Sequence, residues 1–433
     1  MKNTFQNKFS STVFLTAAVL LVGSIIFNAL IDPYRMFEWL DRPGFNRFKP
    51  AIFKRMRLLK AYEVRRLKPD SVLLGSSRCH LAFSPNNAIW KEHADRPYNL
   101  AFDGAMTKEM YYYLRHAQSV HPVKLVLLGI DLYHPTDTPA TTRPDFDPSI
   151  LGVDSRVMSL VRFFLSDLKI LTSFDTLANS IATLRGQDSD EGEWLAPNGQ
   201  RLGEVFFRRP SENFMQFGPR YYFDEINKLE VQYKLEWKVP VKTIKVYPPK
   251  EEKKDAVSSI GYIRKIVEFC RQKNIELKIF FTPSHVTQME LSKILNEWPM
   301  IEKGKRDLVS FMAEDAARHP GEKAIELYDF SGYSIYTTEI LPPVGSQKEM
   351  QYYWDSSHFK EIVGDKVLER IFLNDKTKAK GEDFGVLLNL SNFENAINKI
   401  HRDSLWYEAR NPDVMMLLQK YTDDYKREHH INE

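Results

Sequence analysis

The three residue types that together perform serine-based acyl transfer occur in two distant segments of this chain. In the C-terminal third, Asp355 stands three positions before His358. Far upstream, an apolar run ends on Gly75, which is followed by Ser76 and Ser77. A serine nucleophile, a histidine base and an aspartate that orients the base make up a covalent acyl-transfer site. The sequence predicts such a site if the fold brings the two segments together.

Short buried runs that end on glycine or polar residues predict the elements that would do this. Five runs are typical of buried strands, and the segments around them have helical spacing, which predicts a parallel sheet covered on both faces. The predicted strands are 70–75, 98–102, 123–131, 276–281 and 324–330. The predicted helices are 106–120, 260–273 and a closing helix at 364–373.

Ligands of such sheets bind beyond the C-terminal ends of the strands, so the residues at those ends are candidates for the site. Gly104 and Asp131 each follow a strand, and so does His285, which is a candidate substrate contact. Arg78, directly after Ser77, is a candidate for binding a substrate carboxylate or phosphate, or else forms a salt bridge on a helix surface. A serine on a strand-to-helix turn has an exposed hydroxyl and nearby backbone N–H groups that can meet an oxyanion.

Each of these residues also has a purely structural interpretation. Ser76 and Ser77 are good helix N-caps, and Asp355 could cap the last helix. His358 could be an ordinary surface histidine, and Gly104 a turn glycine.

Composition excludes several classes of protein. The chain has 433 residues, 43% of them hydrophobic, which is enough for a sizeable core. The net charge is only +3 and no basic tract is interleaved with aromatics, so we expect no nucleic-acid partner. The two cysteines, Cys79 and Cys270, are interpreted as buried thiols, with a disulfide between them as the alternative. The histidines show no metal-ligand spacing, and we expect neither metal nor cofactor.

The N-terminus carries the one long apolar run. Residues 9–31 are uncharged and long enough to cross a bilayer as a helix. Basic residues precede the run and no small-x-small cleavage site closes it, which favours an uncleaved single-pass anchor. Cations also follow the run, so charge alone does not fix its orientation.

The expected organisation follows from these patterns. Residues 1–31 form the N-terminal tip and anchor, and 32–68 form a basic juxtamembrane segment that either lies on headgroups or leads as a solvated helix into the domain. Residues 69–373 form the α/β domain, with an insertion at about 136–255 that holds a helical segment at 157–185 and a loop near 186–203. Residues 374–433 form a polar tail that packs on the domain.

At these motifs the chain resembles the SGNH (GDSL-type) hydrolase superfamily. It is most similar to the membrane-anchored branch that works beside membrane-bound O-acyltransferases in bacterial cell-surface acylation. The resemblance covers about 68–135 and 255–373, the anchor and Asp32-Pro33-Tyr34. It implies a flavodoxin-like three-layer α/β/α sandwich. It also implies Ser77 as the nucleophile, an oxyanion glycine at Gly104, and Asp355 with His358 as the final block.

Two residues depart from the family pattern. Ser76 stands where an acidic residue usually precedes the nucleophile, as it does in the acyltransferase-linked branch. Asp131 stands where an asparagine amide normally donates to the oxyanion, and an ionised aspartate would repel that charge. Asp131 is therefore structural, or the oxyanion hole is left with two backbone donors, which favours slow transfer over hydrolysis.

The resemblance implies a single-pass protein of the bacterial cytoplasmic membrane with its catalytic domain in the periplasm or outside the cell. The expected reaction moves an acyl group, with acetyl as the first choice, to a hydroxyl of a cell-surface or exported glycan. A multi-span membrane-bound O-acyltransferase would be its partner and supply the acyl donor. The alternatives are an esterase that acts on glycan or lipid esters and a non-catalytic partner subunit.

Overall fold

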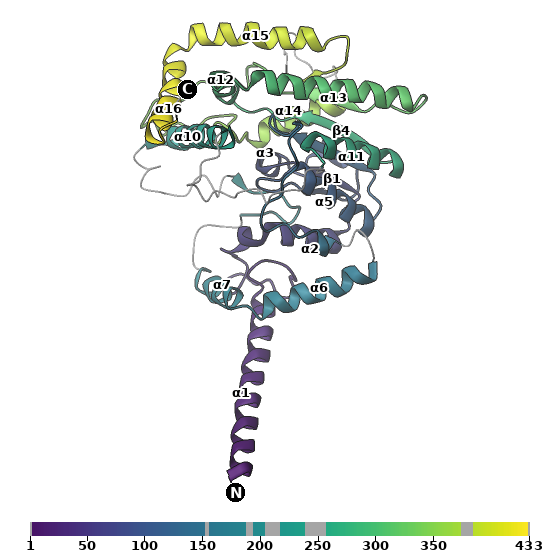
Figure 1. Cartoon of the computed structure of the whole chain (residues 1–433), viewed down its shortest axis with the longest axis vertical. Coiled ribbons are helices and arrows are strands. Elements are labelled where there is room, and N and C mark those ends of the chain that lie inside the picture. The colour runs from purple at the N-terminus through teal and green to yellow at the C-terminus, as the bar shows by residue number, and fades with distance from the viewer. Residues whose placement is uncertain are drawn as a thin grey trace. The chain divides into compact units, whose positions relative to one another are not determined.

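A six-stranded sheet, β2-β1-β3-β4-β5-β6, organises the larger part of this α/β chain (Figure 1). The computed structural model describes residues 2–151, 156–187, 194–203, 217–238, 257–373 and 384–431. Within these residues the first five strands in this order pair in parallel, and β6 pairs antiparallel with β5. The strands are β1 (Ser71–Leu74), β2 (Pro97–Asn99), β3 (Leu125–Ile130), β4 (Glu276–Phe281), β5 (Glu326–Asp329) and β6 (Val386–Leu387).

The chain divides into two compact units. One comprises Met1–Lys68, Arg115–Val120 and Asp145–Glu193, and the other comprises Pro69–Leu114, His121–Pro144 and Trp194–Glu433. The predicted insertion at 136–255 is thus split, because its residues 145–193 cluster with the N-terminal segment. The predicted tail belongs to the unit that contains the sheet.

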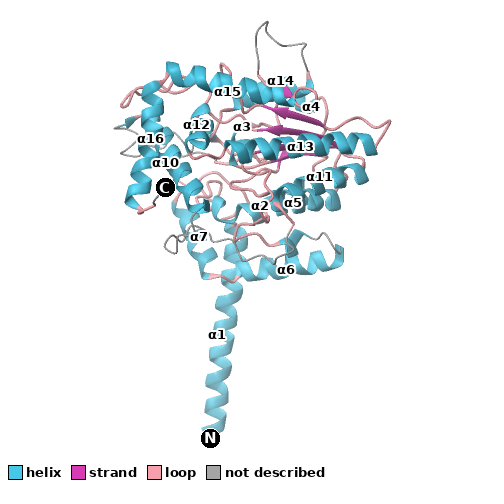
Figure 2. Ribbon diagram, turned by 45° about the horizontal axis from the view of Figure 1, so that its top comes forward, coloured by secondary structure: helices cyan, strands magenta, loops and turns pink. Residues whose placement is uncertain are grey.

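Helices lie on both faces of the sheet (Figure 2). The sheet unit contains α3 (Ser77–Ala82), α4 (Ala88–Lys91), α10 (Pro219–Lys238), α11 (Ser259–Lys273), α12 (Val286–Ile294), α13 (Trp298–Arg318), α14 (Glu361–Phe372), α15 (Phe393–Arg410) and α16 (Pro412–Glu428). Helix α5 spans Thr107–Val120. The N-terminal unit contains α1 (Lys2–Ile31), η1 (Ile52–Arg55), α2 (Met56–Leu67), η2 (Pro148–Leu151), α6 (Arg156–Leu171) and α7 (Phe174–Arg185).

The α/β class, the parallel arrangement of the five predicted strands and the helices that follow them are confirmed. The helical segment expected at 157–185 is two helices, because the Ser173 hydroxyl accepts a hydrogen bond from Thr176 N and starts a new helix at Phe174. The tail contains α15, α16 and β6, where only a polar segment with one apolar patch was expected. Part of the predicted loop at 186–203, residues 188–193, lies outside the described residues.

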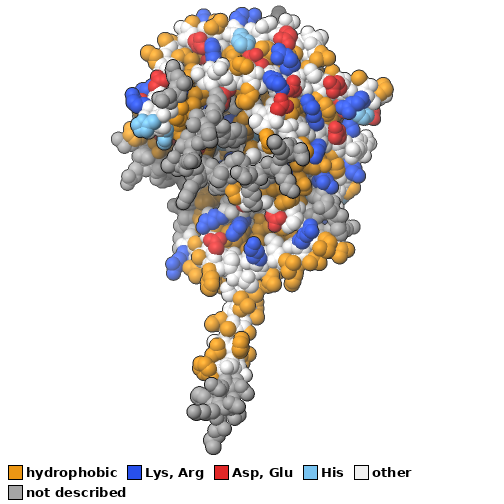
Figure 3. Space-filling view, viewed as in Figure 1, with side chains coloured by type: hydrophobic (Ala, Val, Ile, Leu, Met, Phe, Trp, Pro, Cys, Tyr) orange, Lys and Arg blue, Asp and Glu red, His pale blue; other side chains and the backbone are white. Residues whose placement is uncertain are grey.

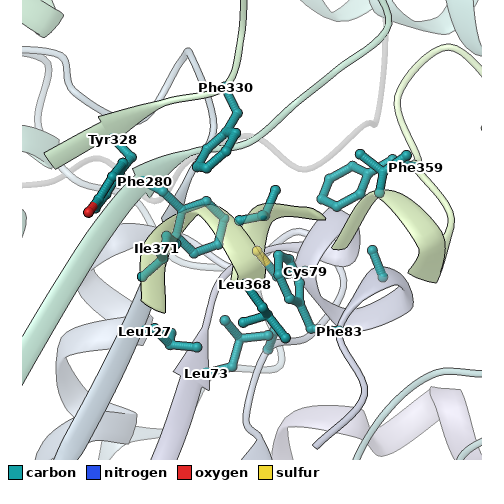
Figure 4. Close-up of a cluster of buried hydrophobic side chains, with 14 of the residues drawn as sticks. Leu73, Cys79, Phe83, Leu127, Phe280, Tyr328, Phe330, Phe359, Leu368 and Ile371 are labelled. Carbon is teal, nitrogen blue, oxygen red and sulfur yellow. The ribbon is translucent and has the colours of Figure 1, made fainter. Parts of the chain in front are cut away.

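The main core connects the sheet to α3 and α14 (Figure 4). Phe280 from β4 lies beside Phe83, and their ring centroids are 5.5 Å apart. Phe359 meets Phe83 edge to face, with ring centroids 5.9 Å apart. Because Phe359 directly follows His358, burial of this ring holds the end of the Asp355–His358 segment against the core. Both cysteines are buried and free, as expected.

Among the described residues, one helix is long and apolar enough to cross a membrane. It covers Phe9–Ile31 of α1, and most of its side chains are exposed. This agrees with the predicted anchor segment in position and length.

Candidate active site

Ser77 is the first residue of α3, directly beyond the C-terminal end of β1. Ser76 has extended backbone geometry and caps the helix, since its hydroxyl accepts a hydrogen bond from Arg78 N at 3.4 Å. As the first helical residue, Ser77 has a backbone N–H with no acceptor inside the helix. Its side chain is partly exposed, whereas the flanking residues Ser76 and Arg78 are buried. The two serines therefore differ: Ser76 caps the helix and Ser77 presents its hydroxyl.

Two glycines let α3 approach the sheet closely. A Cβ atom on Gly75 would lie 2.5 Å from Cys79 Sγ, and one on Gly129 would lie 2.2 Å from the same sulfur. Both distances are shorter than van der Waals contact, so the Cys79 side chain fits only against these two bare backbones. This packing sets the position of Ser77, which is half a turn before Cys79.

Asp355 and His358 lie in a tight loop just before α14. The loop is closed by a bridge between Tyr353 and Phe359 and by a hydrogen bond from Trp354 N to His358 O of 2.9 Å. Inside the loop, Asp355 Oδ1 accepts hydrogen bonds from Ser357 N at 2.7 Å and from His358 N at 2.8 Å. The carboxylate therefore holds the loop in shape with one oxygen and leaves the other for the imidazole.

The loop and α3 bring the three predicted residues into one hydrogen-bonded chain. Ser77 Oγ lies 2.8 Å from His358 Nε2, and His358 Nδ1 lies 2.7 Å from Asp355 Oδ2. Asp355 is completely buried, whereas the His358 side chain is 17% exposed. Asp355 accepts the Nδ1 proton, which leaves Nε2 as the acceptor for the Ser77 hydroxyl. This is the arrangement of a serine nucleophile with its base and the residue that orients the base.

Arg78 connects the helix that carries Ser77 to the Asp355–His358 loop. Its Nε donates to Ser357 O at 3.2 Å, and its Nη1 lies 2.9 Å from Asp131 Oδ2. A further ion pair to Glu230 is longer, at 3.6 Å. The guanidinium is buried, so Arg78 is neither a surface residue, as one interpretation expected, nor an open site for a substrate anion. It is an internal tie between the two halves of the candidate site.

Asp131 is the buried counter-ion of Arg78. It also accepts hydrogen bonds from Thr282 Oγ1 at 2.7 Å and Tyr133 OH at 2.9 Å. Burial would raise the pKa of Asp131, but Arg78, His134 and hydrogen bonds from the Ser76 and Thr282 hydroxyls outweigh burial and hold the pKa well below its usual range. Of the two interpretations of Asp131, the structural one fits, because its negative charge is neutralised inside the protein. A substrate oxyanion therefore gains no donor from this side chain.

Gly104 has a backbone conformation that favours glycine. Its φ is +61°, and a Cβ atom at this position would lie 2.8 Å from Arg143 Nη2. The segment is joined to the nucleophile turn by a hydrogen bond from Phe102 N to Gly75 O of 3.3 Å. Gly104 thus lies in the segment expected to supply an oxyanion donor. Arg143, which packs on it, was not singled out from the sequence.

The carboxylate of Asp103, the residue before Gly104, lies beside the Arg201 guanidinium and the His80 imidazole. Its carboxylate contacts Arg201 Nη1, and its Oδ1 lies 3.2 Å from His80 Nδ1. Burial raises the pKa of Asp103, but Arg201, His80 and the more distant His358 together lower it well below its usual range. No local pattern in the sequence predicts the contact between Asp103 and Arg201, because the two residues are 98 positions apart.

Asn99 holds the C-terminal end of α3 in place. Its side-chain amide donates to Cys79 O at 3.0 Å and to Phe83 O at 2.8 Å, and its Oδ1 accepts from Ala101 N at 3.1 Å. We expect Asn99→Ala to lower the free energy of unfolding by about 3 kcal/mol, because several buried backbone groups lose their partner. Urea unfolding of the full chain measures this loss.

The matched control is Asn86→Ala, since Asn86 is exposed on the segment that follows α3. Its unfolding free energy should stay within about 0.5 kcal/mol of the wild type. Equal losses for the two variants would contradict the role assigned to Asn99.

His285 lies inside the protein, where it has protein partners on both ring nitrogens. Nε2 lies 2.8 Å from Glu339 O, and Nδ1 lies 3.1 Å from Thr287 Oγ1 and caps α12. The side chain is completely buried, so the expected substrate contact is not what the structure shows. His285 instead supports the Asp355–His358 loop, since its backbone N donates to Ser356 O at 3.2 Å.

The buried imidazole of His285 predicts a pH dependence of stability. Burial lowers its pKa from 6.5 to about 4. Because the folded-state pKa is below the unfolded one, the stabilisation is fully present above about pH 6.5 and is lost as the pH falls towards 4. The loss for this one group is up to about 3 kcal/mol.

A His285→Asn variant isolates this effect, because asparagine can still cap the helix but does not titrate. The unfolding free energies of wild type and variant are compared between pH 7 and pH 4. The wild type should lose more stability than the variant as the pH falls. Parallel curves over this range would contradict the assignment.

A comparison with known proteins finds no family model and no curated protein that matches the chain. The interpretation of this site therefore depends on its geometry and on the sequence motifs.

Proposed function

We propose that this protein is a membrane-anchored serine acyltransferase of the SGNH type. The observation that carries the proposal is the hydrogen-bonded chain from Ser77 through His358 to Asp355. The order β2-β1-β3-β4-β5 supports a flavodoxin-like sandwich, for which this strand order is typical. The nucleophile follows β1, next to the point where the strand order reverses, which is where such sheets bind ligands.

The proposed reaction has two acyl-transfer steps. In the first, His358 Nε2 takes the proton of the Ser77 hydroxyl, Oγ forms a bond to the acyl carbon, and the bond from that carbon to the donor oxygen breaks. The proton then passes from His358 to the leaving oxygen. In the second step, a hydroxyl of a glycan gives its proton to His358 and its oxygen forms a bond to the acyl carbon. The bond from that carbon to Ser77 Oγ breaks, and the proton passes from His358 to Oγ, which restores the free serine.

The negative charge that develops in each step needs donors, and we assign them to the backbone N–H groups of Ser77 and Gly104. Asp131 cannot contribute a donor, because its carboxylate accepts hydrogen bonds and is paired with Arg78. Loss of one donor typically costs about 10²–10³-fold in rate. A slow reaction with water gives the acyl-serine time to meet a hydroxyl acceptor, which supports transfer over hydrolysis.

The apolar segment Phe9–Ile31 supports attachment to a membrane. From the family resemblance we propose that this is the bacterial cytoplasmic membrane, with the sheet unit on the periplasmic or outer side. An acyl donor made in the cytoplasm must cross the bilayer, and one helix cannot provide a path for it. We therefore propose a multi-span membrane acyltransferase as partner and an acetyl group as the first candidate to be moved. No cofactor enters the proposal.

The test is acyl transfer by the purified full chain. A p-nitrophenyl acetate donor is supplied together with oligosaccharides that carry free hydroxyl groups, and the products are analysed by mass spectrometry. The proposal expects acetylated oligosaccharide in excess of free acetate formed by the enzyme. Acetate release without transfer would establish an esterase instead, and no acyl-serine at Ser77 under any condition would favour a non-catalytic subunit.

A further inference from the structure

Helix α6 presents a continuous apolar face to the outside of its unit. Its exposed side chains recur at the spacing of one helical face, with Val157 70% exposed and Phe164 65% exposed. The full set is Val157, Met158, Leu160, Val161, Phe164, Leu165 and Leu168. Figure 3 shows hydrophobic side chains along this part of the unit and along α1. A helix face exposed to water is normally polar, so this face indicates a binding surface.

The opposite face of α6 is packed against its own unit. Phe163 is buried, with its ring centroid 5.0 Å from that of Tyr62 and the Arg65 guanidinium 4.0 Å above it. Tyr62 also donates a hydrogen bond to Asp167, one turn further along the helix. The polar and aromatic contacts thus fix how α6 is rotated, and this rotation turns the aliphatic side chains outward.

The apolar face continues directly from the segment that is apolar enough to cross a membrane. The Asn28 side chain, in the last turn of α1, donates to Leu171 O at 2.8 Å and accepts from Ser180 Oγ at 2.9 Å. These contacts attach the end of α6 and the adjoining α7 to the C-terminal end of α1. Phe174, the first residue of α7, is 89% exposed beside them.

The surroundings of this face have the composition of a membrane interface. In the same unit, Trp39 is largely exposed, and Lys169 and Arg185 are exposed on α6 and α7. Tryptophan and basic residues are enriched where a protein meets lipid headgroups. Helices that lie in this plane combine such residues with one broad apolar face.

We propose that α6 is a second membrane attachment, an interfacial helix whose apolar face lies among the acyl chains of the leaflet at the C-terminal end of α1. This inference rests on the membrane anchor in the proposed function. Lipid is the occupant favoured here because the face is continuous with that anchor and its exposed side chains are entirely apolar. Two attachments would restrict rotation of this unit about α1.

The test places an environment-sensitive fluorophore at single positions of the full chain in vesicles of phosphatidylethanolamine and phosphatidylglycerol. Both native cysteines are buried, so an introduced cysteine is the labelling site. Val161→Cys, Leu165→Cys and Leu168→Cys probe the apolar face, and Ser166→Cys is the matched control on the other side of α6. Leu20→Cys, in the exposed part of α1, reports on the anchor itself.

The proposal expects blue-shifted emission together with loss of fluorescence with brominated phospholipids at 161, 165 and 168, and no lipid quenching at 166, which is on the side that packs against its own unit. Emission typical of water and quenching by iodide at 161, 165 and 168, with Leu20 still quenched by lipid, would overturn it and leave the anchor intact. Blue-shifted emission without lipid quenching would show a protein-covered face, such as a second copy, and would also overturn it.

Absence of lipid quenching at Leu20 would reject both the membrane anchor and this inference. Labelling of Ser77 by a fluorophosphonate in the same vesicles reports separately on the proposed active site. Loss of lipid quenching with Ser77 labelling retained would therefore reject the interfacial helix and keep the acyltransferase.

Discussion

Ser77→Ala should abolish formation of the acyl-enzyme and lower the rate of acyl transfer by about 10⁴-fold or more, as for other serine nucleophiles. The physical reason is that the variant lacks the hydroxyl that lies 2.8 Å from His358 Nε2 in the wild type. The measurement is the rate of p-nitrophenol release, combined with mass spectrometry of the peptide that carries position 77. The wild-type peptide should gain the mass of one acetyl group, and the variant peptide should not.

Ser76→Ala is the matched control, because it removes the neighbouring hydroxyl and leaves the proposed nucleophile. Ser76 caps α3, so this variant should lose about 1 kcal/mol of stability but keep most of its activity. If Ser76→Ala abolished the reaction and Ser77→Ala did not, the nucleophile would be Ser76. Unchanged activity in Ser77→Ala together with a silent His358→Ala would reject catalysis at this site.

The parts of the candidate site that could be predicted from the sequence are those encoded locally. Asp355 and His358 are three positions apart, so a single tight turn brings the carboxylate to the imidazole. Ser77 is 281 positions from His358, but it follows a buried strand, and the ends of parallel strands meet at one edge of the sheet. A local spacing and one topological rule were therefore sufficient for these three residues.

The buried ion pair could not be predicted from the sequence. Asp131, taken alone, is a charge that would repel an oxyanion, and Arg78, taken alone, is a surface cation or an anion-binding residue. Each interpretation changes once the two are 2.9 Å apart and buried, because each charge neutralises the other. Removing one partner would leave an uncompensated charge in the interior, which typically costs about 3–5 kcal/mol.

For some helices the sequence predicts an apolar face but does not show what that face packs against. The periodicity in α6 predicts a helix but does not distinguish a core-facing face from a lipid-facing one, since both are apolar. In the structure, the exposure of Val157 and Phe164 and the burial of Phe163 on the opposite side identify the outward face. Helices α15 and α16 were missed because their sequences are mainly polar, and β6 because a two-residue strand has no periodicity.

Asp355→Asn should lower the rate of acyl transfer by about 10⁴-fold, the effect typical of this substitution in a serine triad. Asparagine keeps an oxygen for the backbone N–H groups of Ser357 and His358, so the loop should hold its shape. Its NH₂ group, however, would donate to His358 Nδ1, which places the ring proton on Nε2 and leaves no acceptor for the Ser77 hydroxyl.

The readout for Asp355→Asn is the rate of fluorophosphonate labelling at Ser77, which reports activation of the nucleophile without a glycan acceptor. Asp315→Asn is the control, because Asp315 is a similarly buried carboxylate, paired with Arg271 on α11. This control should lose stability and still label at the wild-type rate. If both variants labelled equally fast, Asp355 would serve only the shape of the loop, and His358 would have to hold its tautomer without it.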